Sequence, residues 1–215
     1  FGQSFWYDNI RRKYLTDGAV QALLDDDGLR GMTSNPTIFE GAIGGSDDYD
    51  DQIRQLVGDG ADAATIYEAL ALADIRAACD LFAPLYHTSG GGDGYVSLEV
   101  SPYLAHDTAG TIAEARRLFQ AVARPNLMIK VPATPEGIPA VRELIAGGIN
   151  VNITLMFNMA HYEAVSAAYI DGLRQWQARG GNPRAVASVA SFFVSRVDTA
   201  VDKRLAALDD PAAAA

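Results

Sequence analysis

The stretch Asn126-Leu-Met-Ile-Lys-Val-Pro-Ala-Thr134 decides the fold of this chain. It is a short apolar run with one lysine in its middle, and Pro132 ends it. Side chains alternate between the two faces of a strand, so three aliphatic residues are predicted on one face: Leu127, Ile129 and Val131. Met128 and Lys130 then share the other face, which places an amine inside the protein near the carboxyl end of the strand.

The chemistry of a buried amine differs from that of a solvated one. A lysine in water has a pKa near ~10.4 and is a poor nucleophile at neutral pH. Burial disfavours the charged form and frees the amine to attack a carbonyl and form a Schiff base. The alternative for Lys130 is an edge-strand lysine whose ammonium group reaches water. This stretch alone favours the alternative, and the decision depends on the other strands.

Composition limits the class of protein. With 215 residues, 49% apolar and 20% charged, the chain is predicted to form one globular domain over residues 1–208, followed by a tail without pattern at 209–215. A net charge of −10 argues against non-specific binding of nucleic acid. An acidic protein that binds phosphate therefore needs a local arginine or a helix terminus.

Cysteine usage and hydropathy indicate a cytoplasmic protein. Cys79 is the single cysteine, which excludes an internal disulfide framework and fits a reducing compartment. No apolar run approaches membrane-spanning length, and the first residues lack the basic and apolar regions of a signal peptide. His87, His106 and His161 lack metal-ligand spacing, so no metal is predicted. Cys79 is expected in a helix core.

Six short apolar segments alternate with helical patterns along the chain. The predicted strands cover residues 4–8, 29–33, 95–100, 127–132, 149–156 and 185–191. The predicted helices cover residues 9–25, 47–57, 63–81, 107–122, 134–147, 158–180 and 194–208. Apolar stripes are expected on the third helix (Ile66, Leu70, Ala73, Ala77, Leu81) and on the last (Val194, Val197, Val201, Leu205, Leu208). Such alternation predicts a parallel sheet with right-handed crossovers.

The polar residues inside the strands favour a barrel over an open sheet. An open sheet covered on both sides has nearly continuous apolar strands. Here one face of three strands is polar, with Ser97 and Glu99, then Lys130, then Asn152 and Thr154. The interior of a (β/α)8 TIM barrel, where chemistry sits at the carboxyl ends of the strands, explains this pattern. A full barrel needs eight strands and typically ~250 residues, so the last two βα units are predicted to be missing.

Several polar side chains are predicted at or near strand ends, where they converge: Asp8, Asn35, Glu99, Lys130, Thr154 and Ser191. In this set Lys130 attacks a ketone, and the iminium that forms is an electron sink for breaking the adjacent carbon–carbon bond. A carboxylate must take the proton of the hydroxyl that becomes an aldehyde, and Asp8 or Glu99 is placed to do this. Thr154 could hold a relay water.

At this point the sequence resembles the transaldolases. The motifs occur in order: Phe5-Trp-Tyr-Asp8, Thr33-Ser-Asn-Pro-Thr-Ile-Phe39, Val96-Ser-Leu-Glu-Val100, Ile129-Lys-Val-Pro-Ala-Thr134, Val151-Asn-Ile-Thr-Leu-Met-Phe157 and Ser188-Val-Ala-Ser-Phe-Phe-Val-Ser-Arg-Val-Asp198. The resemblance implies a class I aldolase-like (β/α)8 barrel, of which this chain holds about six units. It also implies transfer of a dihydroxyacetone unit from sedoheptulose 7-phosphate to glyceraldehyde 3-phosphate, giving erythrose 4-phosphate and fructose 6-phosphate in the pentose phosphate pathway.

The resemblance also implies a role for each matched residue. Lys130 is the nucleophile, Asp8 the acid/base, and Glu99 and Thr154 manage the catalytic water. The substrate is held by Asn35 and Ser191 at its hydroxyls and by Arg196 at its phosphate. The implied partners are phosphorylated sugars, with no cofactor. The long bacterial form is the closest likeness, including fusions to glucose-6-phosphate isomerase, and a homodimer is possible.

Each of these residues also has a structural alternative. Asp8 could cap the first helix, Asn35 could be a turn residue before Pro36, and Arg196 could pair with Asp198 or Asp202 on its own helix. Glu99 and Lys130 could form a structural ion pair across neighbouring strands. Two further functions stay open: a related barrel aldolase that releases the three-carbon unit, and an incomplete barrel without turnover.

Overall fold

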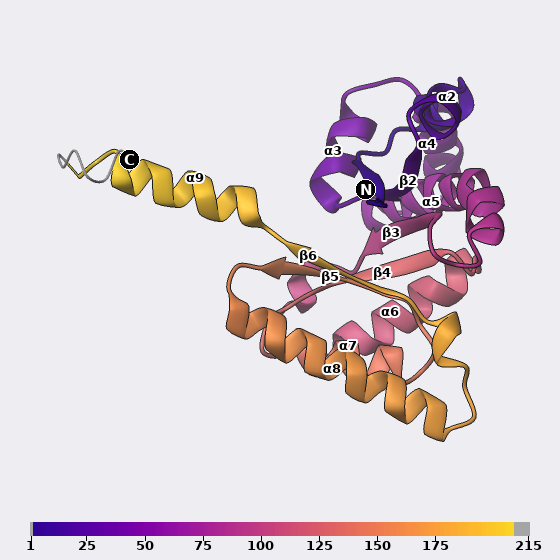
Figure 1. Ribbon diagram of the computed structural model, residues 1–215. Coiled ribbons are helices and arrows are strands. Elements are labelled where there is room, and N and C mark those ends of the chain that lie inside the picture. The colour runs from indigo at the N-terminus through magenta and orange to yellow at the C-terminus, as the bar shows by residue number, and fades with distance from the viewer. Residues whose placement is uncertain (1, 209–215) are drawn as a thin grey trace.

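The Lys130 strand lies in the middle of a curled sheet of six parallel strands (Figure 1). The computed structural model describes residues 2–208, so the predicted tail at 209–215 lies outside the described residues. The strands follow the order of the sequence across the sheet: β1 (Phe5–Asp8), β2 (Leu29–Thr33), β3 (Tyr95–Glu99), β4 (Leu127–Pro132), β5 (Val151–Met156) and β6 (Ser188–Phe192). Sequential parallel strands that curl in this way form six consecutive units of the predicted barrel fold.

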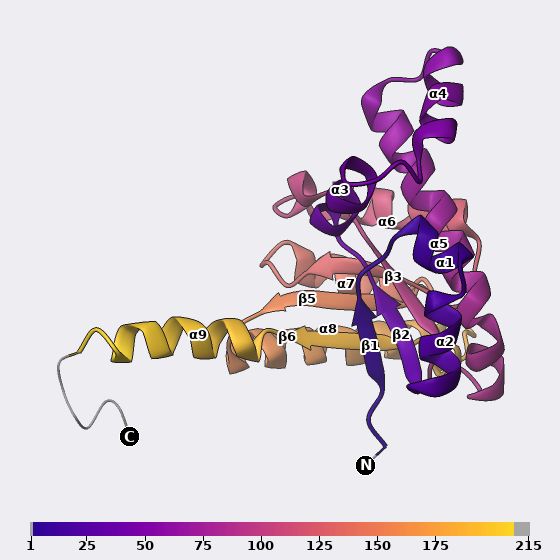
Figure 2. The same ribbon diagram turned by 90° about the horizontal axis from the view of Figure 1, so that it is seen from above.

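Helices alternate with the strands along the chain. They are α1 (Arg12–Thr16), α2 (Ala19–Asp26), α3 (Pro36–Gly44), α4 (Asp50–Gly58), α5 (Ala63–Thr88), α6 (Thr108–Val122), α7 (Gly137–Ile145), α8 (Met159–Ala178) and α9 (Val194–Leu205). Helices α5 to α8 pack against β3 to β6, as Figures 1 and 2 show. None of the helices in this described part is long and apolar enough to cross a membrane.

The central strand β4 has the predicted alternation. Leu127, Ile129 and Val131 belong to the apolar core between the sheet and the helices. Met128 and Lys130 face the inside of the curve. Because the strand is buried on both faces, the lysine cannot reach bulk water along the sheet edge, and the edge-strand alternative for Lys130 is wrong.

Local sequence signals explain where several helices begin. The Asp107 side chain accepts a hydrogen bond from the Gly110 amide (2.9 Å), and Asn158 accepts one from the His161 amide (2.9 Å). Both residues therefore cap the helices that they precede, α6 and α8.

The segment after β1 and the segment after β2 differ from the sequence prediction. The single helix predicted at 9–25 is broken into α1 and α2, because Gly18 has a left-handed backbone (φ 87°) between them. Helix α3 was not predicted. It begins at Pro36, whose fixed φ suits the first helical position, and Asn35 caps it by accepting a hydrogen bond from the Ile38 amide (2.9 Å).

The predicted apolar stripes are partly wrong for two helices. On α5 the buried face includes Leu70, Ile75 and the charged Asp74, whereas the predicted Ala77 is exposed. Helix α9 exists, but it extends away from the sheet in Figure 1, and within the described residues its stripe contacts no core. Val194 and Leu208 are 56% and 57% exposed.

Asn126, at the start of the central stretch, ties the strand to two neighbouring elements. Its buried side-chain amide donates hydrogen bonds to the carbonyl oxygens of Cys79 on α5 and Gly94 before β3, each at 2.9 Å. Cys79 itself is buried in the helix core, as expected. The amide thus fixes the entry of β4 at the amino end of the sheet.

We predict that Asn126→Leu lowers the free energy of unfolding by about 2–3 kcal/mol, because two buried carbonyl groups lose their donor. Urea unfolding followed by circular dichroism measures the change. The matched control is Gln120→Leu, which makes the same kind of exchange at an exposed position of α6 and is expected to change stability by at most about 0.5 kcal/mol. Equal effects of the two substitutions would show that the two buried hydrogen bonds of Asn126 do not stabilise the fold.

Candidate active site

A cavity of about 540 Å³ opens at the carboxyl ends of the strands. It brings together six of the seven residues that the sequence singled out: Asp8, Asn35, Glu99, Lys130, Thr154 and Arg196. They come from five successive strand ends and from the first turn of α9. Carboxyl ends of parallel strands meet at one end of a barrel, which is why residues far apart in the sequence meet here.

Lys130 is 7% exposed, and its amine lies among oxygen atoms. Nζ is 3.7 Å from a carboxylate oxygen of Glu99 and donates a long hydrogen bond (3.4 Å) to the backbone carbonyl oxygen of Ser34. Glu99 and Lys130 are register partners on adjacent strands, so the sheet itself sets this pairing. The amine is therefore held in a nearly dry place at the cavity floor.

The environment of Glu99 is unusual for a carboxylate. Burial raises the pKa of Glu99 above its ordinary value, the positive charge of Lys130 opposes that shift, and the negative charge of Asp8 adds to it. Burial outweighs the attraction of the lysine. Glu99 and Lys130 do form an ion pair across neighbouring strands, at 3.7 Å, so the structural alternative for these two residues stays open.

Asp8 lies at the end of β1 and is exposed at the cavity wall. The alternative reading as a helix cap is wrong: the residue in the capping position of α1 is Arg11, and that cap has no side-chain hydrogen bond. Asn35 both caps α3 and lines the cavity, so its side chain is fixed by a helix terminus rather than by a simple turn.

Thr154 faces the cavity by the regular alternation of β5, and an irregularity of the strand follows it. The register between β5 and β6 shifts between Ile153 and Met156, and Leu155 has a left-handed backbone (φ 64°). A leucine rarely adopts this conformation, which costs roughly 1–2 kcal/mol. Strain of this kind persists where the surrounding structure enforces it, often at functional sites. Here it lets consecutive residues, Thr154 and Leu155, both line the cavity.

Arg196, the second cation lining the cavity, stacks on an aromatic ring. Its guanidinium carbon lies 4.4 Å from the centre of the Phe193 ring, and that ring packs against Phe157 with centres 5.5 Å apart. Within the described residues it forms no ion pair with Asp198 or Asp202, so the alternative pairing is not found. The stacking directs the charge toward the cavity mouth.

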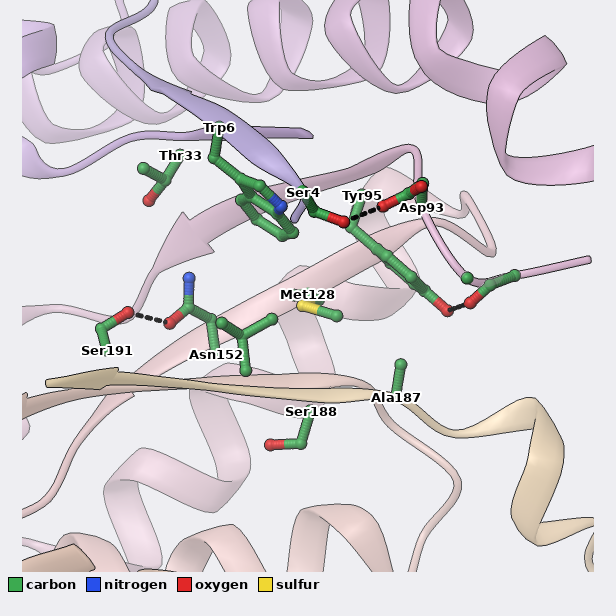
Figure 3. A pocket seen from close by; sticks show the side chains of 13 residues that line it. Ser4, Trp6, Thr33, Asp93, Tyr95, Met128, Asn152, Ala187, Ser188 and Ser191 are labelled. Atoms are coloured by element: carbon green, nitrogen blue, oxygen red, sulfur yellow. Dashed lines mark hydrogen bonds between the residues drawn. The ribbon is translucent and has the colours of Figure 1, made fainter. Parts of the chain in front are cut away.

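Ser191 does not line this cavity. It lies in a neighbouring space of about 460 Å³ inside the curve of the sheet, where Figure 3 shows its hydroxyl pointing at Asn152. Ser191 Oγ donates to Asn152 Oδ1 (2.9 Å), and Asn152 Nδ2 donates to Ser97 Oγ (3.0 Å). The chain of hydrogen bonds crosses from β6 to β3 behind Lys130.

The site also contains two buried polar residues, Asn152 and Ser34, that were not among the predicted site residues. Asn152 pairs in register with Lys130, and its alternation with Thr154 on β5 was the available signal. Ser34 provides the carbonyl oxygen for Lys130 and donates its hydroxyl to the Ser97 carbonyl (2.7 Å). No sequence signal identifies a backbone acceptor. Among residues 2–208, no group of three or more His, Cys, Asp or Glu side chains could hold a metal ion.

A curled sheet of parallel βα units, with polar side chains gathered at the carboxyl ends of its strands, is the architecture of a (β/α) barrel protein. Comparison with known sequences identifies the family. The model of the family described as Transaldolase/Fructose-6-phosphate aldolase matches residues 5–215, and the chain belongs to this family.

Curated relatives agree with that assignment. The chain is 52% identical to a transaldolase of Thiobacillus denitrificans over 96% of its own length, and 50% identical to a transaldolase of Parafrankia sp. over 100%. It is 49% identical, over 93% of its own length, to a protein named Transaldolase 2 of Nostoc punctiforme. The chain spans only 58%, 58% and 52% of these three relatives.

The two neighbours of Glu99 are predicted to move its pKa in opposite directions. Lys130→Met removes the attraction that lowers the pKa of Glu99 and should raise it further; Asp8→Asn removes a repulsion and should lower it. Titration of carbon-13-labelled glutamate by NMR measures both shifts. If the pKa of Glu99 moved the same way in both variants, the electrostatic account of the site would be wrong.

Proposed function

We propose that the protein is a transaldolase that transfers a dihydroxyacetone unit through a Schiff base on Lys130, without a cofactor. The observation that carries the proposal is the buried amine of Lys130, 3.7 Å from Glu99, in one cavity with Asp8 and Arg196. The names of the curated relatives support the same activity.

The first step is iminium formation. The neutral amine of Lys130 attacks the ketone carbon of sedoheptulose 7-phosphate, and the carbinolamine then loses water. Glu99 is suited to give and take the protons of this step, because its raised pKa lets it exchange protons closer to neutral pH. Thr154, buried in the same cavity, is proposed to hold the water.

The second step breaks the carbon–carbon bond. The Asp8 carboxylate accepts the proton of the hydroxyl on the carbon that becomes the aldehyde, and the bonding electrons move into the iminium. Erythrose 4-phosphate leaves, and an enamine stays on Lys130. The enamine carbon then attacks glyceraldehyde 3-phosphate, Asp8 returns the proton to the new alkoxide, and hydrolysis of the iminium releases fructose 6-phosphate.

Binding of the substrate is assigned to residues at the cavity mouth and beside it. Arg196 would bind the phosphate, and its stacking on Phe193 leaves the guanidinium edge free for a bidentate contact. Asn35 would bind a substrate hydroxyl from the end of α3. We propose that Ser191, which does not line the cavity, acts indirectly through its hydrogen bond to Asn152.

Other predictions from the resemblance are independent of this proposal. A homodimer, a fusion to a sugar-phosphate isomerase domain and a cytoplasmic location stay predictions. The single domain over 1–208 also stays a prediction, although all six described strands belong to one sheet.

Lys130→Ala is predicted to abolish covalent trapping and to reduce transfer to the background rate, because Lys130 supplies the one amine among the described residues that line the cavity. The chain is incubated with dihydroxyacetone and borohydride, and mass spectrometry of peptides locates the adduct. The matched control is Lys13→Ala, which removes an exposed lysine of α1 and should leave trapping unchanged. Trapping retained in Lys130→Ala would identify another nucleophile.

A second candidate function follows from the family description, which also includes fructose-6-phosphate aldolase. An aldolase would release free dihydroxyacetone, whereas a transaldolase retains the enamine until an aldehyde arrives. We predict that fructose 6-phosphate yields little free dihydroxyacetone alone, and that added erythrose 4-phosphate starts rapid formation of sedoheptulose 7-phosphate. Equal release of dihydroxyacetone with and without the acceptor would favour the aldolase.

A third candidate is a barrel without turnover, and the share of 58% of the relatives' length is the observation that favours it. The chain is assayed alone and after extension with the remaining residues of the Thiobacillus denitrificans relative. Activity in neither form, with both folded, would support this candidate over the other two.

A further inference from the structure

We propose that Arg12, Tyr49 and Asp74 are positioning residues for Asp8: a buried hydrogen-bonded cluster anchors the segment that follows the catalytic aspartate. The inference rests on the proposed function, since it concerns the role of Asp8 as the acid/base at the carbon–carbon bond. None of the three residues lines the cavity of Lys130, so they would act through Asp8.

The segment after Asp8 is short and cannot hold itself in place. Three residues separate the end of β1 from α1, and α1 has only five residues with no side-chain cap. A helix of that length has almost no stability of its own in water. The position of the segment therefore depends on contacts with other elements.

Asp74 supplies the central contact. One of its carboxylate oxygens accepts a hydrogen bond from Arg12 Nε (2.8 Å), and the other accepts one from the Tyr49 hydroxyl (2.9 Å). The same hydroxyl oxygen accepts a hydrogen bond from the backbone amide of Arg12 (3.1 Å). The Arg12 guanidinium lies over the Tyr49 ring at 4.5 Å. Both the backbone and the side chain of Arg12 are thus fixed.

Asp74 occupies a position where an apolar residue is expected. It is 2% exposed on α5, between the buried Leu70 and Ala78, and burial raises its pKa although Arg12 and Tyr49 oppose that shift. Buried ion pairs are often no more stabilising than apolar residues of similar size. The carboxylate instead orients its partners, because its two oxygens hold the Arg12 and Tyr49 donors at defined angles.

Two further contacts hold the segment between the anchor and the sheet. Arg11 binds the carboxylate of Asp48 at 2.7 Å, next to Tyr49 in the sequence. Ile10 is 1% exposed in the core. On the other side, Asp8 pairs in register with Thr33 of β2. Figure 2 shows α1 lying beside α5, against which it packs. The main chain from Asp8 to Arg12 therefore has fixed points at both ends.

The consequence for catalysis is selective. Iminium formation uses Lys130 and Glu99 and does not need Asp8 under the proposed mechanism. Cleavage and transfer need the Asp8 carboxylate at hydrogen-bond distance from the substrate hydroxyl, where an error of about 1 Å can cost on the order of 10²-fold in rate. Loss of the anchor should therefore slow transfer and leave Schiff-base formation intact.

The test uses Asp74→Asn in the full-length protein. We expect kcat for transfer from fructose 6-phosphate to erythrose 4-phosphate to fall about 10- to 100-fold, with an unchanged rate of borohydride trapping by dihydroxyacetone. The matched control is Asp80→Asn on the same helix. This substitution also breaks an aspartate–arginine pair, but the pair with Arg124 is exposed and lies far from β1 in the sequence. It should change neither rate.

A double-mutant cycle separates positioning from general destabilisation. In an Asp8→Asn background, where transfer is already reduced by about 10²–10⁴-fold, Asp74→Asn should cause no further loss, because both act through one carboxylate. Additive losses, or parallel losses of trapping and transfer, would overturn the proposal. If Asp74→Asn does not fold, Tyr49→Phe decides: it removes only the bridging hydroxyl and should lower kcat without affecting trapping.

The outcomes also separate this inference from the proposed function. If the unmodified protein traps no adduct at Lys130, the proposed function fails. If it traps and transfers normally, and Asp74→Asn transfers as fast as Asp80→Asn, only the positioning role fails.

Discussion

The rest of the structure depends on the desolvation of one amine and one carboxyl group side by side at the carboxyl end of the sheet. Glu99 and Lys130 are register partners, so the hydrogen bonding of β3 and β4 fixes their separation. Burial raises the pKa of Glu99, and the positive charge of Lys130 opposes that shift.

The strands could be predicted from the sequence because, along each strand of a barrel, residues that face the inside alternate with residues that face the outside. Lys130 and Met128 alternate with three core residues, and polar side chains at 97, 99, 152 and 154 mark the same inner face. Parallel pairing then brings the strand ends together without further information. The helices were less accessible. The break at Gly18 requires a left-handed glycine, and the start of α3 depends on Asn35 acting as a cap rather than as a turn.

The parts of the site that the sequence could not place depend on contacts between strands. Ser191 bonds to Asn152 across β5 and β6, whose register shifts between Ile153 and Met156, and the left-handed Leu155 within that shift has no sequence signature. The burial of Asp74 in the apolar face of α5 also depends on a contact between elements that are far apart in the sequence. Its partner Arg12 is 62 residues away in the sequence. The helical pattern around Asp74 therefore predicts a solvent-exposed aspartate.

The two carboxylates at the cavity differ in a way that follows from where their strands lie. Glu99 is at the end of β3, between two other strands of the sheet, whereas Asp8 is on β1 at the edge and is exposed. Neighbouring carboxylates in unequal environments take unequal proton-transfer roles. The buried group suits reversible protonation during loss of water from the carbinolamine. The exposed group has no dry surroundings to hold it in position, and so it needs an anchor elsewhere in the fold. That need gives a physical reason for a buried carboxylate at Asp74, remote from the chemistry and costly to desolvate.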